Sequence, residues 1–252
     1  SLVGIGFGSM LSGVNAVFCM KQQDFLLLGL DHIVNTNNIL RNENITGSFT
    51  IICIVEDGGY EGPQSASNNL SDFSSFGRID CFSMTNRYDT KIILNENLIR
   101  PGFRILGISQ RLLSQNLLDL ECFNNGIQGK FFQYMNGKDV TIICSNFSLP
   151  YGNKFCEEFK IRGMSASLFS INTYLKFNYS DLIKNISRTK KVLIIDDSKS
   201  ANLLCSDLIN EINNSVESVK SHIIKREYSK DFYYPKSDDL NIDYKNIADS
   251  FM

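Results

Sequence analysis

Polar side chains that could take part in chemistry gather in two short stretches of the first half of the chain. The first stretch, Met20–Phe25, reads Met-Lys-Gln-Gln-Asp-Phe and follows a short apolar run. The second, Gly62–Asn69, contains Gln64, Ser65 and Ser67. Side-chain amides and hydroxyls hydrogen-bond small ligands, although neither type titrates near neutral pH. A loop rich in Ser and Asn is also a good turn former, so a functional and a structural interpretation of the second stretch both stay open.

Two other patterns resemble phosphate or metal sites but have a better structural explanation. Asp57-Gly58, with Asn86 downstream, resembles in part a spacing that binds Mg²⁺ and diphosphate, but Glu56 stands where that pattern has Gly. The glycine run Gly4–Gly8 lacks the preceding strand of a dinucleotide fingerprint. Close packing of a helix against a neighbour explains these glycines. The sequence, with only two His, therefore predicts no metal site.

Composition places the chain among ordinary globular proteins. Of its 252 residues, 43% are apolar and 21% are charged. The net charge of −2 argues against a nucleic-acid surface. No apolar run is long enough to span a membrane, and the first residues lack the basic region of a signal peptide. We therefore expect a cytoplasmic protein whose seven Cys are reduced thiols.

The elements that position these residues alternate between apolar strands and helices, as in α/β proteins with parallel sheets. In the first half a small-residue helix begins near Gly4, and a long loop is expected over Asp57–Arg100. Continuously apolar strands are expected at Val14–Phe18, Phe49–Val55 and Phe103–Ile108. Further helices are expected at Asp24–Asn35 and Gln110–Phe123.

The second half follows a turn signal at Asn136–Asp139 and is more regular. Its strands are expected at Val140–Cys144, Ala166–Ile171, Val192–Asp196 and Val219–Lys225, and its helices at Tyr151–Arg162, Tyr179–Ile186 and Ser200–Ile212. Asp196-Asp197 ends a strand at the edge where α/β proteins bind ligands, but a solvated turn is the favoured interpretation. Short right-handed crossovers predict a doubly wound sheet.

Taken in order, these segments resemble the beta subunits of 2-oxoacid dehydrogenases and the matching half of transketolase. No single motif is highly specific, and the resemblance depends on a collinear set: the helix with Gly4 and Gly13, Asp24-Phe25, Asp31, Pro101–Leu106, Gly137–Ile143 and Arg188–Asp196. It implies an α/β fold of two doubly wound domains. A pyrimidine-binding domain of thiamine-diphosphate enzymes, without its N-terminal part, would span residues 1–130, and a transketolase C-terminal-like domain would span residues 131–252.

The resemblance also implies where thiamine diphosphate would lie. The Glu that hydrogen-bonds the aminopyrimidine ring is expected shortly before Ser1, so the catalytic residue is unknown in this chain. The position of the aromatic side chain that stacks on the ring falls on Gln23, which has no π-face. Met20 and Phe25 are the neighbours that remain as cofactor contacts.

The second stretch corresponds to a substrate loop in which the dehydrogenase relatives place Gln-His-Ser. Gln64, Ser65 and Ser67 occupy it here without a His. A His at that place would serve proton transfer or carboxylate binding.

Two functions therefore stay open. The first is a beta-type subunit of an enzyme that decarboxylates a 2-oxo acid or transfers two carbons from a ketose. It would share thiamine diphosphate with an alpha-type partner, which would hold the Mg²⁺, in an α2β2 or equivalent assembly or a homodimer. The second is a non-catalytic scaffold or binding relative of the same fold, favoured by the loss of the stacking aromatic and of the loop His. The substrate, the acceptor and the pathway are not evident from the sequence.

Overall fold

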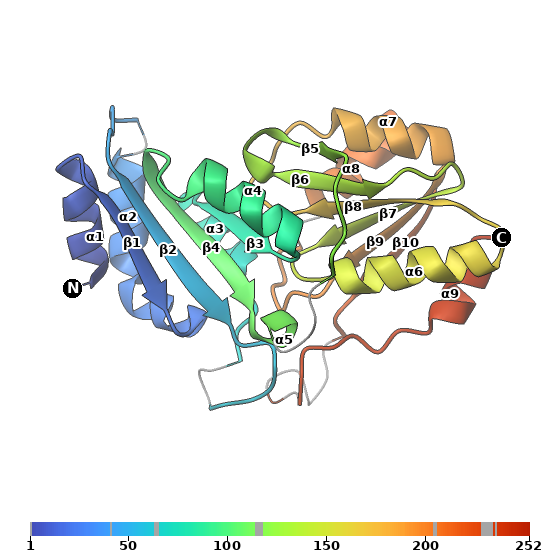
Figure 1. The fold of residues 1–252 in the computed structure, drawn as a ribbon, viewed down its shortest axis with the longest axis horizontal. Helices are drawn as coiled ribbons and strands as arrows, with labels where there is room; N and C mark the ends of the chain where they lie inside the picture. Colours follow the sequence, from blue (N-terminus) through green and yellow to red (C-terminus); the bar gives the residue numbers. More distant parts are fainter. Residues whose placement is uncertain are drawn as a thin grey trace.

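The computed structural model describes residues 2–40, 42–62, 66–113, 118–203, 206–227, 234 and 236–252. These residues form two α/β units that lie side by side, each built around its own sheet (Figure 1). Within the described ranges no helix is both long and apolar enough to cross a membrane. The predicted α/β fold with parallel-sheet domains is confirmed.

The first sheet is parallel, with the strand order β1-β2-β4-β3. Its strands are β1 (Asn15–Met20), β2 (Ser48–Val55), β3 (Asp80–Met84) and β4 (Gly102–Ser109). The two central strands are almost fully buried, as continuously apolar strands covered on both faces should be. Strand β1 lies at a free edge, and its residues alternate between exposed and half-buried.

Helices cover both faces of the first sheet. One face carries α1 (Leu2–Leu11), the 3₁₀ helix η1 (Gln23–Gly29), α2 (Leu30–Leu40) and α3 (Leu70–Gly77), whose apolar side chains form one core cluster with β2 and β4. The other face carries α4 (Arg87–Asn97) and the second unit. A short helix, α5 (Gln110–Leu113), directly follows β4.

The second sheet is mixed, with the order β10-β9-β7-β8-β6-β5. Four strands run parallel, and β6 and β5 add an antiparallel edge. The strands are β5 (Asn124–Asn125), β6 (Phe131–Met135), β7 (Val140–Ser145), β8 (Ala166–Ile171), β9 (Lys191–Asp196) and β10 (Lys220–Lys225), and a 3₁₀ turn, η2 (Ile127–Gly129), joins the first two. Helices α6 (Leu149–Ile161) and α9 (Tyr244–Ser250) cover one face, while α7 (Ser180–Thr189) and α8 (Ser206–Ser215) cover the other (Figure 1).

The two units share a core and a buried polar contact. Phe82 and Leu106 of the first sheet pack in one cluster with Phe132 of the second. Asp89, fully buried at the start of α4, accepts hydrogen bonds from the Tyr134 hydroxyl and from the side-chain amide of Asn172, both in the second unit. Its other donors, Thr85, Asn86 and Thr90, lie at the start of the same helix, so α4 is fixed between the two sheets.

Three predictions of secondary structure are wrong in part. The expected loop over Asp57–Arg100 contains α3, β3 and α4. The helix expected over Gln110–Phe123 is present at Gln110–Leu113, and residues 118–123 are not helical. There Leu118 and Leu120 pack on the shared core as a link between the sheets, which explains a leucine spacing that resembles a helix. In the helix expected over Ser200–Ile212, residues 200–203 are not helical and α8 spans Ser206–Ser215.

The glycines near the N-terminus have two different surroundings. A Cβ atom added at Gly6 would lie 2.3 Å from the ring of Phe49 on β2, so the predicted close packing of this helix is confirmed there. At Gly4 and Gly8 an added Cβ atom would meet no other atom within 4 Å, and both residues are exposed.

This contrast gives a matched pair of substitutions. We expect Gly6→Ala to lower the free energy of unfolding by about 1–3 kcal/mol, because the buried Phe49 ring must shift. Gly8→Ala in the same helix should raise it by up to about 1 kcal/mol through helix propensity alone. Urea unfolding at low protein concentration measures both changes. Equal effects of the two substitutions would contradict the packing described for α1.

Candidate active site

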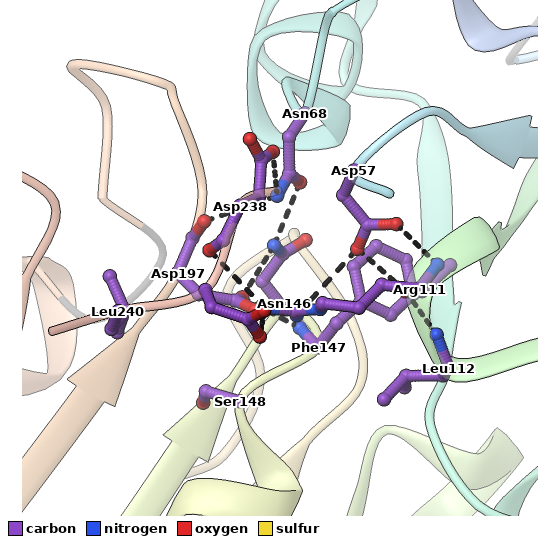
Figure 2. Close-up of polar contacts among 12 residues, drawn as sticks. Asp57, Asn68, Arg111, Leu112, Asn146, Phe147, Ser148, Asp197, Asp238 and Leu240 are labelled. Carbon is purple, nitrogen blue, oxygen red and sulfur yellow. Dashed lines mark hydrogen bonds and ion pairs between the residues drawn. The ribbon is translucent and has the colours of Figure 1, made fainter. Parts of the chain in front are cut away.

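The carboxyl ends of the parallel strands of both sheets meet in the seam between the two units. Asp57 follows β2 and Arg111 follows β4, while Asn146 follows β7 and Asp197 follows β9. Figure 2 shows these four side chains converging from the two sides. Parallel sheets bind ligands at this edge because loops from several strands converge there.

A set of charged and polar side chains fills this seam, and we call it the seam cluster: Asp57, Asn68, Arg111, Asn146, Asp197, Lys199 and Asp238. Arg111 is its centre. Its Nη2 donates to Asp197 Oδ2 at 2.5 Å and lies 3.6 Å from Asp57 Oδ2, and its backbone N–H donates to Asp57 Oδ1 at 2.9 Å. The side chains of both carboxylates are fully buried, so this guanidinium balances two buried charges.

The seam cluster also holds the segment at residues 66–69. The side-chain amide of Asn68 donates to the backbone carbonyl of Asp197 at 3.1 Å and accepts from Asn146 Nδ2 at 2.8 Å. Lys199 Nζ donates to the carbonyl of Ala66 and lies 3.0 Å from Asp238 Oδ1. The second unit therefore positions a loop of the first.

That loop covers a second group of polar side chains, which we call the acidic cluster: Gln23, Asp24, Glu56 and Ser67. Ser67 Oγ donates to Asp24 Oδ1 at 2.5 Å, and the backbone N–H of Asn69 donates to Gln23 Oε1 at 3.5 Å. Burial raises the pKa of the Glu56 carboxyl, and the neighbouring negative charges of Glu61 and Asp24 raise it further, against a hydrogen bond from Gln22 that lowers it.

Three buried polar atoms of the acidic cluster have no hydrogen-bond partner in the part of the chain that the structure describes. They are Gln23 Nε2, Asp24 Oδ2 and Glu56 Oε2. Buried polar groups are paired in the great majority of native structures, because an unpaired one costs about 1–3 kcal/mol. Two unpaired acceptors and one unpaired donor thus follow the ends of β1 and β2, and their types are those that a small ligand with N–H groups and a ring nitrogen would pair with.

The donor and acceptor types of this set match those of an aminopyrimidine, whose amino group donates and whose ring nitrogens accept. The stacking contact is missing. Gln23, which occupies the aromatic position, is fully buried under the 66–69 loop. Phe25 is 40% exposed on η1, and Met20 is half-buried at the end of β1, where it packs on the core of the first unit.

The predicted substrate loop is described only in part. Gln64 and Ser65 lie outside the described residues. Ser67 lies inside them and bonds Asp24, so the structure brings Gln23 and Ser67 into one cluster. The roles of these residues stay predictions.

The acidic pair Asp24 and Glu56 was missed as a unit by sequence reasoning. The signal for this pair was the place of each residue just beyond the end of an apolar strand.

The expectation of a solvated turn at Asp196-Asp197 is wrong, because both residues are fully buried and Asp197 pairs with Arg111. Asp57 accepts hydrogen bonds from the Ser109 hydroxyl and the Arg111 backbone N–H, so its carboxylate is used within the fold. The described residues contain no group of three or more His, Cys, Asp and Glu that could hold a metal ion.

Removing the Arg111 guanidinium from the seam cluster should strongly lower the free energy of unfolding. Arg111→Gln leaves Asp57 and Asp197 buried without their ion pair, so we expect a loss of about 3–5 kcal/mol in the free energy of unfolding. Arg100→Gln is the matched control. It breaks a partly exposed pair with Asp80 and should cost at most about 1 kcal/mol. Chemical denaturation of both variants checks this, and similar losses would contradict a central role for Arg111.

The raised pKa of Asp57 leads us to expect that the stability of the protein falls as pH rises. Burial raises the pKa of Asp57 from 3.8 to about 6, more than the neighbouring Arg111 lowers it. Between these two values the folded state holds a proton that the unfolded state has lost, so stability falls as pH rises. Relative to Asp57→Asn, the wild type should lose up to about 3 kcal/mol from about pH 4 to about pH 6. Urea unfolding at four pH values measures this difference, and a difference that grows with pH would refute the shift.

Comparisons with known proteins agree with the α/β fold described above. No family model matches the chain. The chain is 21% identical, over 248 residues, to the pyruvate dehydrogenase E1 component subunit beta of Cyanidium caldarium, covering 95% of this chain and 74% of that protein.

Among solved structures, the chain resembles a split-gene transketolase in an inactive beta4 tetramer. The TM-score is 0.75 and the identity 11%, over 99% of this chain and 79% of the other. Transketolase from Campylobacter jejuni matches 93% of this chain and 33% of its own, with a TM-score of 0.60 and 14% identity. The predicted resemblance to transketolase and to the beta subunits of 2-oxoacid dehydrogenases is confirmed, in fold by these structures and in sequence by the Cyanidium protein.

Proposed function

We propose that the chain is a beta-type subunit of a thiamine-diphosphate-dependent enzyme and that its first unit forms the pyrimidine side of the cofactor site. The first unit would correspond to residues 1–130 and the second, transketolase C-terminal-like unit to residues 131–252. An alpha-type partner would hold the diphosphate and Mg²⁺, in an α2β2 or equivalent assembly. The reaction would act on a 2-oxo acid or a ketose.

One observation carries this proposal. Buried and unpaired acceptor atoms of Asp24 and Glu56 lie at the carboxyl edge of the first sheet, in a chain with the transketolase fold. In the proposed complex these two carboxyls would accept from N–H groups of the aminopyrimidine, and Gln23 Nε2 would donate to a ring nitrogen. When bound, the thiazolium of the cofactor supplies the electron sink for carbon–carbon bond cleavage.

The chain's own residues would position the ring and shield it from water. Ser67 holds the Asp24 carboxyl, and Lys199 and Asn68 hold the loop that carries Ser67. Burial raises the pKa of Glu56, so this carboxyl would exchange a proton at a higher pH than an exposed Glu does. Met20 and Phe25 would flank the site.

A second candidate, a non-catalytic scaffold, is supported by the surroundings of Gln23. This side chain offers no aromatic face and is buried beneath the loop. A relative that kept the fold and the partner surface but lost ring stacking would show this arrangement.

Cofactor uptake separates the two candidates. We expect saturable uptake of thiamine diphosphate with Mg²⁺ only when the chain is mixed with its alpha-type partner, measured by isothermal titration calorimetry. Glu56→Gln should weaken this uptake about 10- to 100-fold, because it replaces one acceptor of a buried charge-assisted hydrogen bond.

Glu43→Gln, the same exchange at an exposed position, is the control and should leave uptake unchanged. Assembly of the two chains without any uptake would instead support the scaffold. Equal affinities of the Glu56 and Glu43 variants would remove the acidic cluster from the site.

A further inference from the structure

A groove of about 380 Å³ lies where α3 of the first unit meets the second unit. Its size falls within the range of about 300–1,000 Å³ that is usual for small-ligand pockets. We call it the Arg78 groove, and the lining residues that matter here are Ser71, Ser74 and Arg78 on α3 and its C-cap, Lys176 after β8, and Asn202 and Asp207 near the start of α8. None of them belongs to the seam cluster or to the acidic cluster, so this groove is separate from the candidate active site.

Contacts between the two units fix the walls of the Arg78 groove. Asp72 on α3 accepts hydrogen bonds from the Ser200 hydroxyl at 2.6 Å and from the side-chain amide of Asn202 at 3.0 Å. The chain that leaves β8 pairs with β3 of the first sheet through a bridge at Thr173, which brings Lys176 to the side of α3. The groove is therefore formed without a ligand, and a preformed site lowers the entropic cost of binding.

Two cations from different segments of the lining have no counter-charge. Arg78 and Lys176 are both exposed, and neither forms an ion pair with the residues that the structure describes. Among the described residues of the lining, Asp207 is the one acid. It stands in the first turn of α8, where a carboxylate interacts favourably with the helix dipole. The lining as a whole is therefore positively charged.

A buried hydroxyl of the same groove also lacks a partner. Ser71 is 7% exposed, and its Oγ has no hydrogen-bond partner in the described part of the chain. Ser74, one turn further along α3, differs because its Oγ donates to the carbonyl of Ile79 at 2.8 Å. Buried hydroxyls are paired in the large majority of native structures. Ser71 therefore has a donor to offer to a ligand in the groove.

We propose that the Arg78 groove binds a phosphate dianion, either free or as the phosphate group of a small ester. The guanidinium of Arg78 can donate two parallel hydrogen bonds to one phosphate, and Lys176 adds a second positive charge. The Ser71 hydroxyl supplies one more donor. A dianion matches the two cations of the lining, whereas a carboxylate carries half of that charge and has one oxygen fewer for these donors.

The test is a titration of the full chain with inorganic phosphate and, separately, with methyl phosphate, each at constant ionic strength. We expect saturable binding by isothermal titration calorimetry and a rise in the thermal unfolding midpoint, because the ligand binds the folded state. Tighter binding of methyl phosphate would assign the groove to a phosphate ester, and tighter binding of inorganic phosphate would assign it to the free ion. Neither thiamine diphosphate nor an alpha-type chain is needed, so failure here is distinguishable from failure of the proposed function.

Two substitutions at Arg78 separate binding from folding. Arg78→Gln should weaken phosphate binding at least about tenfold, because it removes a charged bidentate donor. Arg78→Gly should weaken it equally without destabilising the protein. Arg78 has a φ of 50° at the C-cap of α3, a left-handed conformation that Gly adopts without steric cost. A loss of binding in a variant that unfolds at the same or a higher temperature cannot come from loss of the fold.

Arg87→Gln on α4 is the matched control. Arg87 is also exposed and forms no ion pair with the described residues, but it lies outside the groove. This variant loses the same charge and should bind phosphate like the wild type. A wild type that binds neither probe would overturn the proposal, and so would equal affinities of the Arg78→Gln and Arg87→Gln variants.

Discussion

The buried guanidinium of Arg111 constrains how the two units meet. It contacts carboxylates from both sides, Asp57 at the end of β2 and Asp197 at the end of β9. Taking three charges out of water costs several kcal/mol per ion, and this cost is offset only when the geometry is good and the remaining lone pairs are satisfied. Asp197 meets the second condition through Asn146 and the backbone N–H of Phe147. The units can therefore pack in few relative positions.

The position of the candidate site follows from this constraint. The loop at residues 66–69 belongs to the first unit by sequence, but its backbone and Asn68 bond Lys199, Asp197 and Asp238 of the second. Ser67 therefore reaches Asp24 because the second unit holds its neighbours in place. A shift between the sheets would move the loop relative to Gln23 and Asp24, so the packing of the seam and the geometry of the acidic cluster are coupled.

Sequence reasoning identified the elements whose signal is local. The apolar runs at Phe49–Val55 and Val140–Cys144 could be recognised as strands because burial on both faces leaves no polar alternation. The signals that depend on distant partners were missed. Asp89 of the α4 capping box also accepts hydrogen bonds from Tyr134 and Asn172, which are distant in sequence. The two acids at Asp196-Asp197 suggest a solvated turn until Arg111, also distant in sequence, is placed beside them. The resemblance to a family gave the place of Gln23 and Ser67 but not the pairing of Asp24 with Glu56.

The buried acids of the two clusters differ in whether the described chain satisfies their oxygens, and this difference distinguishes acids that stabilise the fold from acids that could bind a ligand. Asp57 and Asp197 use both of their oxygens within the chain, so their burial is explained by the fold alone. Asp24 and Glu56 are also buried, but each leaves one oxygen without a partner among the described residues. The burial of Asp24 and Glu56 is therefore not explained by the described fold alone, and this is why the acidic cluster, and not the pair of Asp57 and Asp197, is the candidate site.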